Sequence, residues 1–198
     1  IKKQLYGEAY LVRFADDFLI MFQYESDAQR VYEAVIKRME LFGLELSKEK
    51  TRILPFGRYS VSRETFDFLG FTHFNSKTRK GYYTVGHKIS RKKKKQFKSN
   101  LKKWVKENRN TQFDEFMKAL NKKLTGSFNY YSLSGMIREV RNLWHHSLYV
   151  TFKWINRRSQ RRSFKLERFC EIWNDRIIHP YIHVDIWSGD KVIYNKNV

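Results

Sequence analysis

Apolar residues gather first in two short runs, at residues 10–14 and 18–22. Both runs are rich in residues that favour β-strands. Between them stand Ala15, Asp16 and Asp17, and aspartate favours turns over strands. The pattern therefore predicts a β-hairpin with two adjacent carboxylates at its tip.

The two acids at this tip repel each other, and a bound cation would relieve the repulsion. Mg²⁺ suits the pair because it takes carboxylate oxygens and leaves room for substrate phosphates. A solvated acidic turn explains the spacing of Asp16 and Asp17 equally well. The residues alone therefore make this pair a candidate metal site and leave the plain turn as the alternative.

After the hairpin, apolar residues recur at the spacing of an α-helix. Residues 26–29 form a capping-box pattern, with Ser26 as the N-cap and Gln29 three residues later. Gly43 is a suitable C-terminal stop. The apolar positions at helical spacing are Val31, Val35, Ile36, Met39 and Phe42. We expect this amphipathic helix to cover one face of the sheet, with its apolar side chains in the core.

A second hairpin is predicted further along the chain. Large apolar residues alternate over residues 66–74, which predicts one strand with a bend at Gly70. A turn at residues 77–81 and a returning strand at 82–85 complete it. Residues 44–54 lie before it, in a loop that is expected to run into a strand.

The second half of the chain is predicted to be helical. One helix is expected to begin near Ser90. Three more are expected at about residues 111–124, with a stop at Gly126, at about 134–156 and at 164–173. The Trp and Phe residues at helical spacing are expected to lie mainly in the core. The fold class is therefore α+β, with antiparallel strands and a covering helix in residues 1–86 and a helical bundle, mainly three long helices, in 87–198.

Composition narrows the function classes. The chain has 198 residues, 41% of them apolar, which is enough for a globular core. No apolar run approaches the roughly 20 residues that a membrane span needs, so no membrane partner is expected. The single cysteine, Cys170, excludes a disulfide framework and a cysteine-rich zinc site, and it fits a reducing compartment.

Positive charge is concentrated in the second half. The net charge is +20; residues 1–86 hold 14 Lys and Arg against 11 Asp and Glu, and residues 87–198 hold 26 against 9. Basic and aromatic residues together suit a nucleic acid, which offers phosphates and flat bases. An anionic membrane surface and an acidic protein partner are the weaker alternatives.

Two basic runs are the candidate nucleic-acid contacts. The first opens a helix, where the helix dipole disfavours cations, and phosphate contact would relieve that strain. The alternative for such a run is a solvated helix face. The candidate residues are Arg91, Lys92, Lys93, Lys94, Lys95, Arg157, Arg158, Arg161 and Arg162.

Several blocks resemble a known family. Residues 14–17, Phe-Ala-Asp-Asp, resemble the Tyr-x-Asp-Asp box of reverse transcriptases, with Phe14 in place of the tyrosine. Residues 41–51 and 66–71 resemble the next two blocks of the group II intron reverse transcriptase/maturase family, in the family's order. The blocks that resemble its thumb, or maturase, domain are residues 120–121, Gly126, 129–131 and 154–164.

The resemblance covers nearly the whole chain and implies two domains. Residues 1–86 would be the C-terminal part of the palm, and residues 87–198 the helical thumb, or maturase (X), domain. Two Mg²⁺ ions would be held with Asp16 as a direct ligand and Asp17 in a weaker or outer role. The third carboxylate ligand is expected on an earlier strand outside this chain, so we expect no polymerisation by the chain alone.

The same resemblance assigns further contacts. Phe14 would pack against nucleic acid, and Lys50 would contact the triphosphate or pyrophosphate, with plain solvation as the alternative for this lysine. The hairpin around residues 66–85 would be the primer grip, or simply an edge hairpin that packs on the palm. The primer-grip residues are Phe68, Leu69 and Gly70.

The resemblance implies RNA-directed DNA polymerisation together with binding of intron RNA. The expected partners are group II intron RNA, an RNA template, a DNA primer, a dNTP and a separate fingers–palm half. The alternative is a non-catalytic, RNA-binding, maturase-like splicing factor. Residues 154–164 disfavour a reverse transcriptase of the CRISPR or diversity-generating type. The expected compartment is the bacterial cytoplasm, with an organelle as the alternative.

Overall fold

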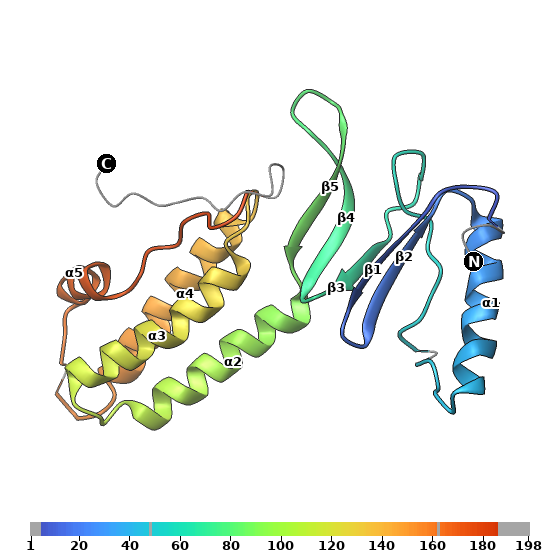
Figure 1. Cartoon of the computed structure of the whole chain (residues 1–198). Helices are drawn as coiled ribbons and strands as arrows, with labels where there is room; N and C mark the ends of the chain where they lie inside the picture. Colours follow the sequence, from blue (N-terminus) through green and yellow to red (C-terminus); the bar gives the residue numbers. More distant parts are fainter. Residues whose placement is uncertain (1–4, 48, 162, 186–198) are drawn as a thin grey trace. The chain divides into compact units, whose positions relative to one another are not determined.

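The computed structural model describes residues 5–47, 49–161 and 163–185 (Figure 1). In these residues the fold is α+β, with two small antiparallel sheets and five helices, which confirms the predicted class. The chain divides into two compact units. We call them the sheet unit, described residues up to 69 together with 73–86, and the helical unit, residues 70–72 together with the described residues from 87 onward.

The sheet unit begins with the predicted hairpin. Strand β1 (Ala9–Phe14) pairs antiparallel with β2 (Asp17–Phe22), and Phe14 lies opposite Asp17. This register leaves only Ala15 and Asp16 for the loop, which is the commonest length of hairpin connection. Asp17 was predicted in the turn, but it is the first residue of β2.

Helix α1 (Glu25–Leu41) follows the hairpin and contacts β2. Its N-cap is Tyr24, which makes no side-chain cap, so the predicted Ser26 cap is wrong. The predicted stop is confirmed, because Gly43 adopts φ +65° and its N–H donates to Glu40 O. A left-handed residue of this kind satisfies the last free carbonyls of a helix, and glycine adopts it at no steric cost.

Asp27 fixes the start of α1 in place of a conventional cap. Its buried carboxylate accepts hydrogen bonds from the backbone N–H of Gly7 (2.9 Å), the backbone N–H of Tyr6 (3.3 Å) and the Arg30 guanidinium (2.7 Å). Burial acts to raise the pKa of Asp27, but these hydrogen bonds outweigh it, and the pKa lies below its ordinary value. The carboxylate therefore ties the first turn of α1 to the segment before β1.

Stability of the sheet unit is expected to fall in acid because of Asp27. Since its pKa is lower in the folded chain than in the unfolded one, the stabilisation is complete above about pH 4 and is lost as the pH falls through the folded pKa. Chemical unfolding measured between pH 2 and 6 should show this loss. Asp27→Asn should be less stable at neutral pH and lack the same pH dependence; an identical acid dependence in both proteins would contradict the assignment.

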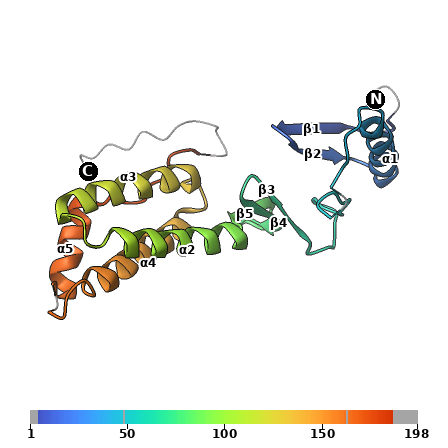
Figure 2. The same cartoon turned by 90° about the horizontal axis from the view of Figure 1, so that it is seen from below.

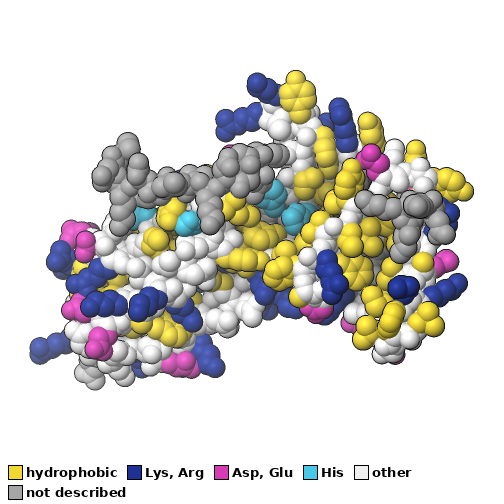
Figure 3. Space-filling model, in the orientation of Figure 1, with side chains coloured by type: hydrophobic (Ala, Val, Ile, Leu, Met, Phe, Trp, Pro, Cys, Tyr) yellow, Lys and Arg dark blue, Asp and Glu magenta, His cyan; other side chains and the backbone are white. Residues whose placement is uncertain are grey.

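Burial in the sheet unit is sparse. Val31 is buried on α1, as predicted, but Phe42 is 66% exposed, so its expected place in the core is wrong. A two-stranded ribbon offers little surface for a 17-residue helix to cover. Leu11 and Phe14 on β1 are each 63% exposed, and apolar side chains gather over this part of the molecule (Figure 3).

The second sheet has the order β3 (Thr65–Phe68), β4 (Phe71–Lys77), β5 (Tyr83–Ile89). The single strand predicted over residues 66–74 is therefore wrong. Leu69 and Gly70 both take positive φ, +50° and +82°, and two such residues in succession reverse the chain between paired strands. No strand precedes β3 in residues 49–64, where the sequence also predicted one.

The helical unit consists of α2 (Arg91–Asn108), α3 (Phe113–Tyr131), α4 (Ile137–Ile155) and α5 (Leu166–Arg176). The first three lie side by side and are the three long helices that the sequence predicted (Figures 1 and 2). The predicted stop at Gly126 is wrong, because α3 continues to Tyr131. Burial of Phe128, 2% exposed, offsets the roughly 1 kcal/mol that glycine costs inside a helix.

Aromatic side chains fill the core of the helical unit. Trp144 and Trp173 are buried as predicted, and Trp173 packs against Trp144 and Phe169. Trp104 and Trp154, in contrast, are only half-buried. None of the described helices combines the length and apolar character that crossing a bilayer requires.

Candidate functional site

The acidic tip is the first candidate site. Asp16 lies in the two-residue turn and Asp17 begins β2, and both are exposed. Ala15 adopts φ +53°, a left-handed conformation that costs a non-glycine residue about 1–2 kcal/mol. The Arg13 Nε–H donates to Ala15 O at 2.9 Å and holds this conformation. The strand register and Arg13 thus fix the turn that carries the acids.

Carboxylates at this tip fit a Mg²⁺ ion as part of a larger ligand set. Mg²⁺ is usually bound by one or two carboxylates, with water and substrate phosphates completing the shell. Within the described residues no three or more His, Cys, Asp or Glu side chains converge as a metal site. The tip therefore offers two ligands, Asp16 and Asp17, and the roles predicted for them stay predictions.

Two other predicted contacts lie in the sheet unit. Phe14 ends β1 opposite Asp17, so its exposed ring is beside the acids in the hairpin register. Lys50 is exposed on a separate turn, where its backbone N–H donates to Ser47 O at 3.0 Å. The turn leaves the Lys50 ammonium group in solvent, as both the contact and the solvated alternative require.

The predicted primer-grip residues form the turn between β3 and β4. Phe68 ends β3, and Leu69 and Gly70 make the reversal. Gly70 belongs to the helical unit: its carbonyl accepts a hydrogen bond from the Ser90 N–H at 3.0 Å. A Cβ at Gly70 would lie 3.4 Å from the Tyr131 hydroxyl oxygen. Phe71, the next residue, stacks on the Tyr130 ring at 5.5 Å.

One cation of the first basic run has an ion-pair partner among the described residues. Ser90 caps α2 and accepts a hydrogen bond from the Lys93 N–H. The Lys94 ammonium forms an ion pair with Glu139 at 2.9 Å and so joins α2 to α4. Lys94 therefore has an internal partner that the sequence did not predict. The members of the run that are exposed are Arg91, Lys92, Lys93 and Lys95.

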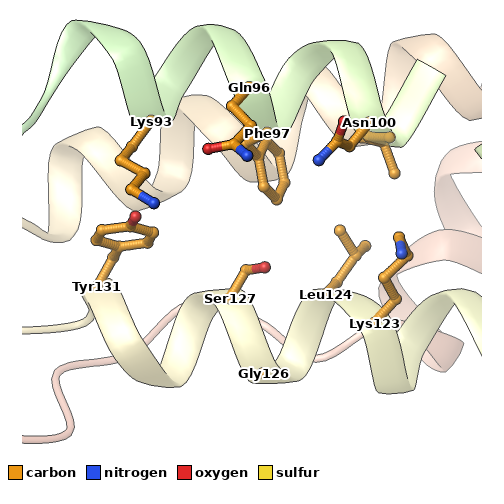
Figure 4. A pocket seen from close by; sticks show the side chains of 10 residues that line it. Lys93, Gln96, Phe97, Asn100, Lys123, Leu124, Gly126, Ser127 and Tyr131 are labelled. Carbon is orange, nitrogen blue, oxygen red and sulfur yellow. The ribbon is translucent and has the colours of Figure 1, made fainter. Parts of the chain in front are cut away.

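A groove of about 430 Å³ runs between α2 and α3 (Figure 4). Lys93 and Tyr131 lie at one end and Lys123 at the other, and Phe97 points between them. The polar groups along it are the Gln96 and Asn100 amides and the Ser127 hydroxyl, and the remaining lining residues are Leu101, Leu124 and Gly126. Only Lys93 among these residues was predicted as a contact. The spacing of Lys93, Gln96 and Asn100 places them on one helix face, a signal that sequence reasoning missed.

This groove has the chemistry of a nucleic-acid surface. Cations at its two ends suit phosphates, which position a nucleic acid without reading its sequence. Amides and a hydroxyl in the middle suit the hydrogen-bonding edges of sugars and bases. The groove thus combines both kinds of contact on two neighbouring helices.

Gly126 offers a direct test of the groove. A Cβ built there meets no atom within 4 Å, so Gly126→Ala should stabilise α3 by about 0.5–1 kcal/mol and leave RNA affinity nearly unchanged. Gly126→Leu should project into the groove and weaken RNA binding by roughly tenfold, the effect of about two lost phosphate contacts. Thermal unfolding and RNA titration of both variants check this. Equal RNA affinity of the leucine and alanine variants would contradict a role for the groove.

The second basic run lies on a loop after α4 that side-chain hydrogen bonds hold in place. The Asn156 side-chain amide donates to Phe164 O (3.1 Å), and its Oδ1 accepts from the Phe164 N–H (2.9 Å). Phe164 packs in turn on Phe113, with ring centroids 5.0 Å apart. The predicted contacts Arg157, Arg158 and Arg161 lie on this loop, whereas Arg162 lies outside the described residues.

Comparison with protein families matches both parts of the chain. Residues 1–73, which include the acidic tip, match the model described as reverse transcriptase (RNA-dependent DNA polymerase). This part of the chain is thus similar to the reverse transcriptase family.

Residues 94–170 match the model of the group II intron, maturase-specific domain, and they include most of the groove and the second basic run. The chain belongs to the group II intron reverse transcriptase/maturase family, as the sequence blocks predicted. No curated protein matches the chain significantly.

Proposed function

We propose that the chain takes part in RNA-directed DNA synthesis, with Asp16 and Asp17 as metal ligands. The observation that carries the proposal is the pair of exposed carboxylates on a fixed hairpin tip, within the segment that matches the reverse transcriptase model. Two Mg²⁺ ions held at these carboxylates would lower the pKa of a primer 3′ hydroxyl and offset the charge on the transferred phosphoryl group.

The other side chains of the sheet unit hold the substrates in this proposal. Phe14 packs against the nucleic acid beside the acids, and Lys50 contacts the triphosphate of the dNTP or the leaving pyrophosphate. The turn at Phe68, Leu69 and Gly70 holds the primer end. A fingers–palm half supplies the remaining template and nucleotide contacts.

The helical unit binds RNA in the same proposal. Two observations support RNA binding. Residues 87–198 hold 26 basic residues against 9 acidic ones, and a groove lies between α2 and α3. The partners are group II intron RNA, an RNA template and a DNA primer. The compartment we propose is the bacterial cytoplasm.

A second candidate function is RNA binding in splicing without polymerisation. The observation that favours it is the match of residues 94–170 to the maturase-specific domain. In this case the acids of the tip are a solvated turn, and the helical unit performs the function.

One set of assays separates the two functions. RNA affinity should fall roughly a thousandfold or more between 50 and 200 mM salt if six or more phosphates are contacted, and a flat salt response would contradict both functions. Primer extension on an RNA template with Mg²⁺ is then measured for the chain alone and for its mixture with a fingers–palm half from the family. Synthesis only in the mixture supports the polymerase. Salt-sensitive RNA binding with no synthesis in either supports the splicing factor.

A further inference from the structure

Three cations surround the half-buried ring of Trp154. The distances to the ring centroid are 5.7 Å for Lys106 Nζ, 5.5 Å for Arg109 Cζ and 5.6 Å for Arg157 Cζ. Lys106 lies in the last turn of α2, Arg109 follows that helix, and Trp154 and Arg157 stand at the end of α4. Two helix ends far apart in the sequence thus direct their positive charges to one indole ring.

Local interactions explain how the cations are held there but do not neutralise them. The face of an indole attracts cations, and each helix C-terminus carries about half a negative charge. Both interactions stabilise the cations at this place and leave their charge unchanged. In the described part of the chain, none of the three cations forms an ion pair with a carboxylate; the ion pairs found there involve other residues. The three positive charges therefore lie close together at one ring.

The cluster is also held in place before any ligand arrives. Arg157 is the first residue after Asn156, whose amide makes two hydrogen bonds to the backbone of Phe164. Ile155, on the other side, is buried in the core at 1% exposed. The backbone at Trp154 and Arg157 is therefore fixed, and less ordering is needed when a ligand binds.

We propose that Trp154 gathers Lys106, Arg109 and Arg157 into a clamp for consecutive phosphates of an RNA backbone. The ligand is an anion rather than a stacked base, because the cations over the ring occupy the surface on which a base would stack. The three cations lie within about 6 Å of one ring centroid, so neighbouring phosphates of one strand can contact them together. The proposal rests on the RNA binding proposed above and adds a contact that depends on charge rather than on sequence.

The test compares salt dependence in matched variants. The first is Lys106→Gln/Arg109→Gln/Arg157→Gln, and the control is Lys118→Gln/Lys122→Gln/Lys165→Gln, which removes the same charge from exposed positions of the helical unit. Titration with a mixed-sequence single-stranded RNA between 50 and 200 mM salt gives the slope of log affinity against log salt. The clamp variant should lower the slope by about two to three and the affinity by roughly thirtyfold, and the control should change both much less.

Trp154 has its own readout as a positioning residue. Trp154→Leu keeps all three charges but removes the ring, and it should lower RNA affinity and the salt slope part of the way. Trp154→Phe retains an aromatic face and should restore most of both. Thermal unfolding of each variant, the clamp variant included, identifies any loss of fold.

The outcomes separate this clamp from the proposed RNA binding. If the wild type binds RNA and the clamp and control variants behave alike, only the clamp is overturned. Wild type that binds no RNA overturns the proposed RNA binding and the clamp with it. A parallel titration uses vesicles of anionic phospholipid. A clamp variant that loses vesicle binding but keeps RNA binding would assign the cluster to a lipid surface and overturn the proposal.

Discussion

Asp16→Asn is expected to lower Mg²⁺-dependent primer extension by at least about a thousandfold, measured in the mixture with a fingers–palm half. Asparagine keeps the size of the side chain and suits a turn, so the hairpin should retain its register. It lacks the negative charge that holds a metal ion. A metal ion at a phosphoryl group contributes several kcal/mol to transition-state stabilisation, and about 4 kcal/mol corresponds to a thousandfold in rate.

Controls for Asp16→Asn separate chemistry from folding and binding. Its thermal unfolding and its RNA affinity should match those of wild type, because the RNA contacts we propose lie mainly in the helical unit. Asp17→Asn should reduce the rate less, in line with the outer role predicted for Asp17. Full synthesis by the Asp16→Asn mixture would remove the tip from the polymerase mechanism and leave the acidic turn as a solvated feature.

Trp173→Ala is expected to cost the helical unit about 3–5 kcal/mol of unfolding free energy. Trp173 is fully buried, and its ring centroid lies 5.9 Å from that of Trp144 and 6.1 Å from that of Phe169. Removing the indole leaves a cavity that rigid α-helical neighbours fill only in part. Chemical unfolding followed by tryptophan fluorescence or circular dichroism measures the loss.

Two variants calibrate the Trp173 measurement. Tyr149→Ala, also on a helix but 58% exposed, should change stability by no more than about 0.5 kcal/mol. Trp173→Phe should cost less than alanine, because the ring is partly kept and the buried indole N–H, which has no hydrogen-bond partner among the described residues, is removed. A loss below about 1 kcal/mol in Trp173→Ala would contradict its central place in the core.

Local signals in the sequence predicted much of the fold. The hairpin followed from two apolar runs separated by acids, and the end of α1 followed from Gly43, since both depend on neighbouring residues. The reversal at Leu69 was missed because leucine rarely takes positive φ. Helix α3 passes Gly126 because of distant packing around Phe128, which no local rule contains.

The candidate sites show the same division. Asp16 and Asp17 are adjacent in sequence, so their place at one tip was predictable. The partner of Lys94, Glu139, lies on another helix, and the groove joins side chains of α2 and α3. Such pairings depend on how helices pack, and the period of a single helix shows only which face is polar.

Gly70 has a mechanical consequence. The Gly70 carbonyl accepts a hydrogen bond from the N–H of Ser90, the residue that caps α2. Gly70 belongs to the helical unit, although it lies between two strands. The start of α2 and Gly70 are therefore expected to move together. If Gly70 contacts a primer end, as proposed, a shift of the start of α2 would move that contact by the same step.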